Sequence, residues 1–391
     1  MRRALFGLVV ATAACGGSEK PVKPLALQQK DAAKTARGLL AEARDAAKAN
    51  DVDGADKAYA KAYAASKDFE ILEERIDFLL HAGKPTRAQA AAREYTDANN
   101  ADARGLKLYA EALLAGNKGR EALVVADSLI EINGDDGNGY EKRGRALLLI
   151  DRNDEGIEAL RKAVALDGSN AGFQTQLGLA LYKAGKVDEA ALKFKKALDK
   201  SPDDPQLLVY LGMSRRSQGE LEEAKSLLEK ARELDPDNGR VYFELGLLFN
   251  AQQKQGESEQ ALAIAVQKSP NESQYWYALG EIFRLQSRFS EAINAYKKSN
   301  ELDPPYPKAI GKLGLLYVEA KKYDEAETVL IPAIRQDPKN PVNYLYLGVV
   351  YAAKGQKRNA IENYERFIEL APKGDPDIKR AKSAISELKR R

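Results

Sequence analysis

Glycine recurs at a spacing of 34 residues through most of this 391-residue chain. The regular glycines are Gly144, Gly178, Gly212, Gly246, Gly280, Gly314 and Gly348. Prolines keep the same spacing at Pro202, Pro236, Pro270, Pro304, Pro338 and Pro372, and alanines do so at Ala190, Ala224, Ala292, Ala326 and Ala360, with Ser258 filling the one gap. A fixed period of this length predicts a tandem array of one small structural unit.

Each period predicts two α-helices. A leucine precedes each regular glycine from Gly178 to Gly348, and bulky residues follow three positions later at Leu181, Phe249, Phe283, Tyr317 and Tyr351, which is an apolar stripe at helical spacing. Turn glycines such as Gly185 and Gly219 then lead into a second amphipathic run with Ala190 and Phe194. We expect the regular glycines and alanines to let the two helices approach closely, because larger side chains would hold them apart.

Residues at the ends of the periods predict where helices start and stop. An Asp or Asn that can cap the following helix closes six periods: Asp102, Asp136, Asn170, Asp204, Asn238 and Asn340. Pro205, Pro307 and Pro341 come next, at the first helical position, where proline is tolerated. The regular prolines fall where the second helix has to end.

The pattern resembles the tetratricopeptide repeat. The unit with Trp276, Leu279, Gly280, Phe283, Ala292, Tyr296 and Pro304 resembles that family's signature at nearly every position. Ten units fit the register: 36–68, 69–102, 103–136, 137–170, 171–204, 205–238, 239–272, 273–306, 307–340 and 341–374. The first three depart from the pattern, with Ala43, Ile76 and Ala110 in place of the glycine. The resemblance implies an all-α fold, a right-handed α-solenoid superhelix of helix-turn-helix repeats.

Residues 375–391 predict one more amphipathic helix. Ile378, Ala381, Ile385 and Leu388 share one face. Terminal repeats of such arrays expose an apolar face, so we expect this helix to cap the solenoid.

The N-terminus is typical of a bacterial signal peptide. Arg2 and Arg3 precede an apolar run that is too short to span a bilayer and ends at Cys15, the one cysteine of the chain. Residues 12–15 (Thr-Ala-Ala-Cys) resemble a lipobox, although the family prefers leucine where Thr12 stands. We therefore expect a signal peptide at 1–14, lipidation of Cys15 and a tether at 15–35 that turns helical from about Leu25. The alternatives are cleavage after residues 11–13 (Ala-Thr-Ala) without a lipid, or an uncleaved cytoplasmic adaptor.

The residue inventory argues against an enzyme. One histidine, His81, and one cysteine leave no Cys–His pair and no histidine-rich metal centre, and no glycine loop that could cradle phosphate is present. Residues 133–139 are rich in glycine and acid but lack the spacing of a calcium loop. The formal net charge is +3 with acids and bases interleaved, which does not favour nucleic acid. We expect no catalytic residues, cofactor or metal.

The resemblance implies that the first helix of each unit lines a concave groove. Groove positions in the early units are charged, at Glu70, Glu73, Asp77, Arg104, Lys107, Glu111, Glu141 and Arg145. Later units supply the candidate partner-binding residues Tyr182, Val209, Met213, Phe243, Leu247, Tyr277, Leu315, Val318, Leu345 and Val349. The alternative for any one of them is packing against the neighbouring helix. Apolar groove residues favour docking of an extended peptide or an amphipathic helix.

These observations predict a scaffold that binds other proteins of the bacterial cell envelope and is tethered to the outer membrane through Cys15. Lipoproteins of this architecture serve pilus and secretin assembly, motility or polysaccharide export. The competing hypothesis is a soluble secreted or periplasmic module that binds peptide or glycan and carries no lipid. Lipid attachment at Cys15 separates the two.

Overall fold

The described part of the chain is built from α-helices. The computed structural model describes residues 25–390, and within them lie 21 α-helices and no strand. The predicted all-α array of paired helices is confirmed. The predicted signal peptide at 1–14 and Cys15 lie outside the described residues. None of the helices in residues 25–390 is long and apolar enough to cross a membrane.

The chain divides into two compact units, 1–159 and 160–391, and the boundary falls inside helix α8 (Asn153–Leu166). The described helices of the first unit before α8 are α1 Leu25–Lys48, α2 Val52–Ser66, α3 Phe69–His81, α4 Pro85–Ala98, α5 Ala103–Ala115, α6 Gly119–Ile132 and α7 Gly137–Leu149. The three repeats that depart from the pattern are therefore helix pairs too. Helix α1 begins at Leu25, so part of the expected tether is the first helix.

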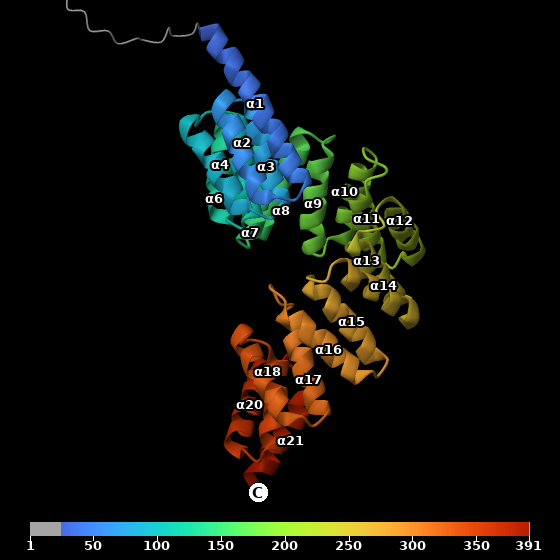
Figure 1. Cartoon of the computed structure of the whole chain (residues 1–391). Helices are drawn as coiled ribbons and strands as arrows, with labels where there is room; N and C mark the ends of the chain where they lie inside the picture. Colours follow the sequence, from blue (N-terminus) through green and yellow to red (C-terminus); the bar gives the residue numbers. More distant parts are fainter. Residues whose placement is uncertain (1–24, 391) are drawn as a thin grey trace, which may run out of the picture. The chain divides into compact units, whose positions relative to one another are not determined.

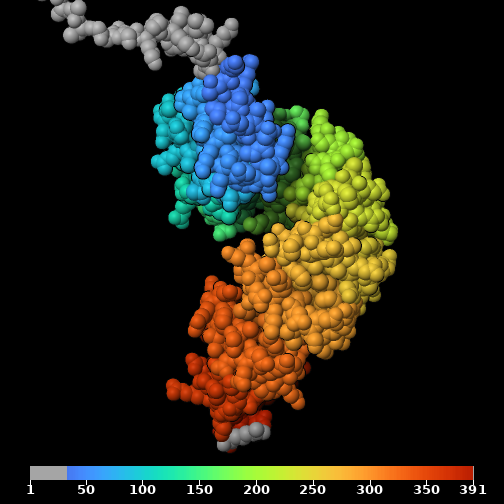
Figure 2. Space-filling model, viewed as in Figure 1, coloured from blue at the N-terminus to red at the C-terminus, as the bar shows by residue number. Residues whose placement is uncertain are grey.

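The second unit continues the same alternation and ends on one extra helix (Figure 1). Its helices after α8 are α9 Ala171–Lys183, α10 Val187–Leu198, α11 Pro205–Ser217, α12 Leu221–Leu234, α13 Gly239–Ala251, α14 Gln255–Lys268, α15 Ser273–Leu285, α16 Phe289–Glu301, α17 Ala309–Glu319, α18 Tyr323–Gln336, α19 Pro341–Ala353, α20 Lys357–Leu370 and α21 Pro376–Arg390. Each first helix packs against its own second helix, as α13 does against α14. Figure 2 shows the yellow and light orange parts of the chain packed closely against one another.

The regular glycines hold the two helices of a pair together. A Cβ atom added to Gly178 would lie 2.6 Å from the Phe194 ring, and one added to Gly314 would lie 2.4 Å from Leu330. The glycine thus faces a large side chain sixteen residues later, on the second helix of the same pair. The predicted close approach is confirmed, since a larger residue would occupy space that the partner side chain already fills.

The predicted helix ends are confirmed with one exception. Asp102, Asp136, Asn170, Asp204, Asn238 and Asn340 each accept a hydrogen bond from a backbone N–H of the helix that follows. Pro205 and Pro341 are the first residues of α11 and α19. The expectation for Pro307 is wrong, because α17 begins two residues later, at Ala309. Tyr306 stands where most other repeats place a capping Asp or Asn, and no side chain caps α17.

The C-terminal helix caps the array as predicted. Ala381 of α21 is 1% exposed and clusters with Ala360, Tyr364 and Phe367 of α20. Ile378, Ile385 and Leu388 pack against the same cluster, so the apolar face of the last pair is covered.

Other features of the sequence have ordinary structural roles. Residues 133–136 join α6 to α7, with Asp136 capping α7, and residues 137–139 are the first three residues of α7. His81 is an exposed residue at the end of α3, and its Nδ1 lies 2.7 Å from the Asp77 carbonyl oxygen. Pro332 lies inside α18, which continues through it to Gln336.

Candidate partner-binding surface

The first helices of successive pairs contact one another. In the second unit α9 contacts α11, α11 contacts α13, α13 contacts α15, and α17 contacts α19. In the first unit α3 contacts α5, and α5 contacts α7. The first helices of each unit therefore present a shared surface, which we call the helix-A face.

Eight of the ten predicted groove residues are half-buried on the helix-A face of the second unit. They are Tyr182, Met213, Leu247, Tyr277, Leu315, Val318, Leu345 and Val349. Half-burial is what a binding surface needs, because the side chain is held in place and still has atoms open to a partner. The Tyr182 hydroxyl shares a hydrogen bond of 2.9 Å with the Ser217 hydroxyl, on the neighbouring first helix.

Two of the predicted groove residues are core residues that a partner could not reach. Val209 is 0% exposed and packs with Val241 and Leu245 of α13. Phe243 is 4% exposed and stacks on Tyr275 of α15, with ring centroids 4.5 Å apart. Both lie where one first helix touches the next, so the neighbouring helix covers them.

Tyr277 marks a second aromatic contact along this face. Its ring centroid lies 4.6 Å from that of Tyr306 and 5.6 Å from that of Tyr296. Burial, with the nearby Glu281 carboxylate, raises the pKa of Tyr277 to about 12, so the hydroxyl stays neutral. Burial opposes ionisation of Glu281, yet hydrogen bonds from Arg284 and Tyr296 outweigh it and lower the pKa of that carboxyl group.

The helix-A face of the first unit is charged, as predicted, and its groups on α5 and α7 form ion pairs. Arg145 forms a two-pronged contact with Glu111 at 2.7 and 2.8 Å, and Lys142 lies 2.5 Å from the same carboxylate. Burial opposes ionisation of Glu111, but the hydrogen bond and charge of Arg145 and the charge of Lys142 lower its pKa to about 2. Lys107 pairs with Asp136 at 2.7 Å. The charges of these groups are therefore paired within the unit, and they do not indicate a ligand site.

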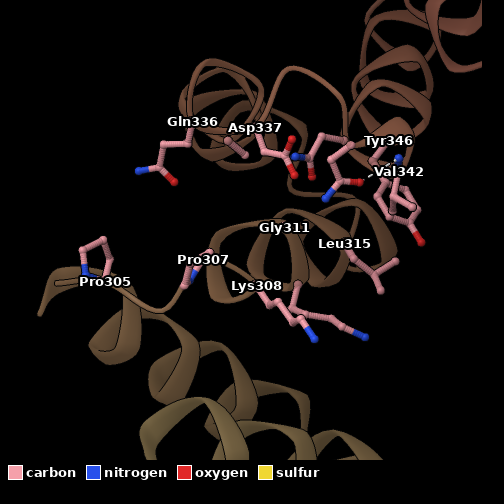
Figure 3. Close-up of a pocket in the computed structure, with 13 residues that line it drawn as sticks. Pro305, Pro307, Lys308, Gly311, Leu315, Gln336, Asp337, Val342 and Tyr346 are labelled. Atoms are coloured by element: carbon pink, nitrogen blue, oxygen red, sulfur yellow. Dashed lines mark hydrogen bonds between the residues drawn. The ribbon is translucent and has the colours of Figure 1, made fainter. Parts of the chain in front are cut away.

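A pocket of about 730 Å³ opens on the helix-A face around α17. Figure 3 shows Gly311 on α17 across from Gln336 and Asp337, with Pro305 and Pro307 at one end and Val342 and Tyr346 at the other. The remaining lining residues are Lys308, Lys312, Leu315, Ala333, Asn340 and Asn343.

Sequence reasoning found Leu315 but missed the rest of this pocket. Two signals in the sequence mark it. Tyr306 interrupts the row of capping residues, and the shortened start of α17 leaves Pro305, Pro307 and Lys308 in a loop that forms one wall. Asn343 interrupts a row of hydrophobic residues at the third position of the first helices.

Three family models match the chain. The model described as the tetratricopeptide repeat domain of cytochrome c-type biogenesis protein H matches residues 252–378, and two tetratricopeptide repeat models match 141–205 and 215–282. The chain therefore contains tetratricopeptide repeats. The three matches leave the residues before 141 unmatched, which agrees with the departures from the pattern in the first three repeats.

Solved structures share the fold. Human IFIT1 bound to m7Gppp-AAAA is 16% identical, with 88% of this chain and 92% of that chain covered and a TM-score of 0.54. TTC0263 of Thermus thermophilus is 19% identical (46% and 99% covered, TM-score 0.43), and YrrB is 21% identical (49% and 98% covered, TM-score 0.39). At 16% identity the likeness to the IFIT1 structure shows a shared fold and nothing about ligands. No curated protein matches the sequence.

Proposed function

We propose that this tetratricopeptide-repeat chain is a protein-binding scaffold of the bacterial cell envelope, and that the helix-A face of its second unit holds an extended segment of a partner protein. Tetratricopeptide repeats generally mediate protein–protein interactions. The observation that carries the proposal is the row of eight half-buried and mostly apolar groove side chains from Tyr182 to Val349, seven of them on helices α11 to α19.

The contrast between the two units supports this assignment of the surface. On the helix-A face of the first unit, charged groups of α5 and α7 form ion pairs within the unit, as Glu111 does with Arg145. Apolar side chains of the second unit such as Leu315 and Leu345 remain partly open to water, although Leu345 also packs against the cluster of α20 and α21. Covering them with a partner would stabilise the complex by the hydrophobic effect, by roughly 25 cal/mol for each Å² of apolar surface removed from water.

The envelope location is the second part of the proposal. It rests on the signal-like run before Cys15 and the lipobox-like residues 12–15, all outside the described residues. Two or three acyl chains on Cys15 would anchor the chain stably, whereas one would not. A partner anchored near the same membrane would then meet the scaffold at high effective concentration.

Photo-crosslinking in living cells tests the binding surface. We place a photo-reactive amino acid at Leu345 or Tyr277, and at Leu192 as the control, since Leu192 is an equally apolar residue 52% exposed on the second helix α10. We expect one dominant protein adduct from Leu345 and Tyr277 that Leu192 does not give. The same adducts from all three positions, or adducts from Leu192 alone, would contradict the proposal.

Metabolic labelling with an alkyne fatty acid tests the anchor. We expect label on the wild-type chain, its recovery in the membrane fraction, and loss of both in Cys15→Ala. An unlabelled chain that is processed and released would favour the soluble periplasmic or secreted module instead. The anchor and the binding surface are thus tested separately.

A further inference from the structure

We propose that the pocket around α17 is a peptide-recognition subsite, in which one apolar side chain of the partner segment enters the pocket while a peptide group of that segment hydrogen-bonds the amide of Asn343. The inference rests on the proposed function and names a place and a chemistry for it. The pocket of about 730 Å³ is large enough for several side-chain and backbone groups.

Asn343 is the residue that most directly indicates a ligand. It lines the pocket, is only 3% exposed, and its Oδ1 has no hydrogen-bond partner within residues 25–390. A buried polar atom left without a partner destabilises a protein by about 1–3 kcal/mol. A side chain that carries this cost and also lines a cavity is explained if a ligand supplies the missing hydrogen bond.

The position of Asn343 in the repeat strengthens this interpretation. It is the third residue of α19, and the equivalent residues of the other first helices in the second unit are all buried and hydrophobic. Those residues are Phe173, Leu207, Val241, Tyr275 and Ala309. Leucine or valine would therefore satisfy the packing at this position, and packing alone does not account for an amide.

An extended peptide is the ligand whose chemistry fits. An asparagine amide carries both donor and acceptor atoms and can pair with the C=O and N–H of one peptide group. Around it, Leu315, Ala333, Val342 and Tyr346 offer apolar contact for a side chain. Gly311 leaves room for the Asn343 amide against α17, because a Cβ atom there would lie 3.0 Å from the Asn343 Oδ1 atom.

Charge near the pocket favours an acidic neighbour in that peptide. Lys308 is exposed and forms no ion pair within residues 25–390, while the Lys312 ammonium lies 3.7 Å from Glu281. Asp337 is the one carboxylate among the lining residues, and Lys308 is left as the lining cation that no carboxylate of residues 25–390 pairs with. We therefore expect an acidic residue beside the apolar side chain that enters the pocket.

Selection from a phage-displayed library of random dodecapeptides on the purified full-length chain tests the inference. We expect enriched peptides that share an apolar residue next to an Asp or Glu. The best of them, made synthetically with a fluorophore, is then titrated against variants. Asn343→Leu is the key variant, because it removes the amide and leaves the apolar packing that the equivalent positions have.

The expected result is a loss of affinity without a loss of fold. Asn343→Leu should weaken peptide binding at least tenfold while its melting temperature stays equal to or above that of the wild type, since an unpartnered polar atom is gone. Val342→Trp, which fills the mouth of the pocket from a residue 44% exposed, should weaken binding to a similar extent. N-methylation of one backbone amide in the peptide should reproduce the loss.

Clear outcomes would overturn the inference. If the peptides bind Asn343→Leu and Val342→Trp as tightly as the wild type, their binding site is not this pocket. If the melting temperature of Asn343→Leu is several degrees lower, the amide serves to stabilise the fold. Crosslinks from Tyr277 that persist unchanged in Asn343→Leu cells, together with unchanged peptide affinity, would leave the scaffold proposal standing and reject this subsite. Absence of crosslinks from every first-helix position in the wild type would reject the scaffold itself.

Discussion

Gly280 of α15 and Tyr296 of α16 are fitted so closely that a Cβ atom on the glycine would lie 2.8 Å from the tyrosine ring. The Tyr296 hydroxyl in turn donates a hydrogen bond to Glu281, the residue after the glycine. The repeating glycine therefore leaves the space that a large residue of the second helix fills. The same relation joins Gly178 to Phe194 and Gly348 to Tyr364.

Gly280→Ala should lower stability by about 1–3 kcal/mol, because the added methyl group overpacks a buried contact. Alanine is otherwise the better helix residue, so helix propensity acts in the opposite direction. Gly256→Ala is the matched control, since Gly256 lies in helix α14 and has no neighbouring atom within 4 Å of an added Cβ. Urea unfolding followed by circular dichroism should show a lower midpoint for Gly280→Ala and an unchanged or higher one for Gly256→Ala.

Asp204→Ala should destabilise the chain by about 0.5–2 kcal/mol through loss of a helix cap. The Asp204 carboxylate accepts hydrogen bonds from the backbone N–H groups of both Gln206 and Leu207 at the start of α11. Glu272 precedes α15 in the equivalent place but forms no side-chain capping bond, so Glu272→Ala serves as the control. Equal melting temperatures for the two variants would show that the cap contributes nothing.

Lys321→Gly should raise stability by up to about 1 kcal/mol, because a left-handed backbone is unfavourable for a residue with a Cβ. Lys321 has a φ of 56° at the turn between α17 and α18, where the equivalent Gly355 has a φ of 75°. Lys322→Gly, one residue later at a φ of −87°, should give no gain. Thermal melts of both variants and of the wild type show whether Lys321→Gly raises the melting temperature and Lys322→Gly does not.

Glu111→Gln should reduce the sensitivity of the first unit to acid. The pKa of Glu111 in the folded chain is about 2, below its ordinary value of 4.5. A lowered carboxyl pKa stabilises the fold above the unfolded-state value, and this stabilisation is lost as the pH falls from about 4.5 towards 2. Removing the carboxylate should therefore lower the melting temperature at pH 7 and flatten its decline in that range.

Glu121→Gln is the control for the acid experiment. Glu121 is an exposed partner of Lys118 at 3.7 Å, and pairs of this kind contribute little. Parallel curves for Glu111→Gln and the wild type between pH 4.5 and pH 2 would contradict the role assigned to the Glu111, Lys142 and Arg145 cluster.

The fold was predictable from the sequence because the same residues that start, end and pack the helices recur in most repeats. Asp204 and Asn238 mark helix starts, Pro202 and Pro236 mark helix ends, and Gly212 and Gly246 mark the contact within a pair. The prediction for Pro307 was wrong because the residue before it, Tyr306, packs on Tyr277 instead of capping α17. A tertiary contact there outweighs a local preference.

The binding surface was less predictable, since it depends on how neighbouring repeats pack. Repeat position alone cannot distinguish Phe243, which stacks on Tyr275 and is buried, from Leu345, which stays half-buried at the same position. The pocket arises from two irregularities, the late start of α17 and the polar Asn343. A search for regular features passes over both.

Hydrogen–deuterium exchange on the purified chain with and without its crosslinked partner tests the central claim most directly. We expect slower exchange in the first helices α15, α17 and α19, and little change in the second helices α14, α16 and α18. A binding surface on the helix-A face requires that alternation. Protection confined to the second helices, or to the first unit alone, would contradict the account.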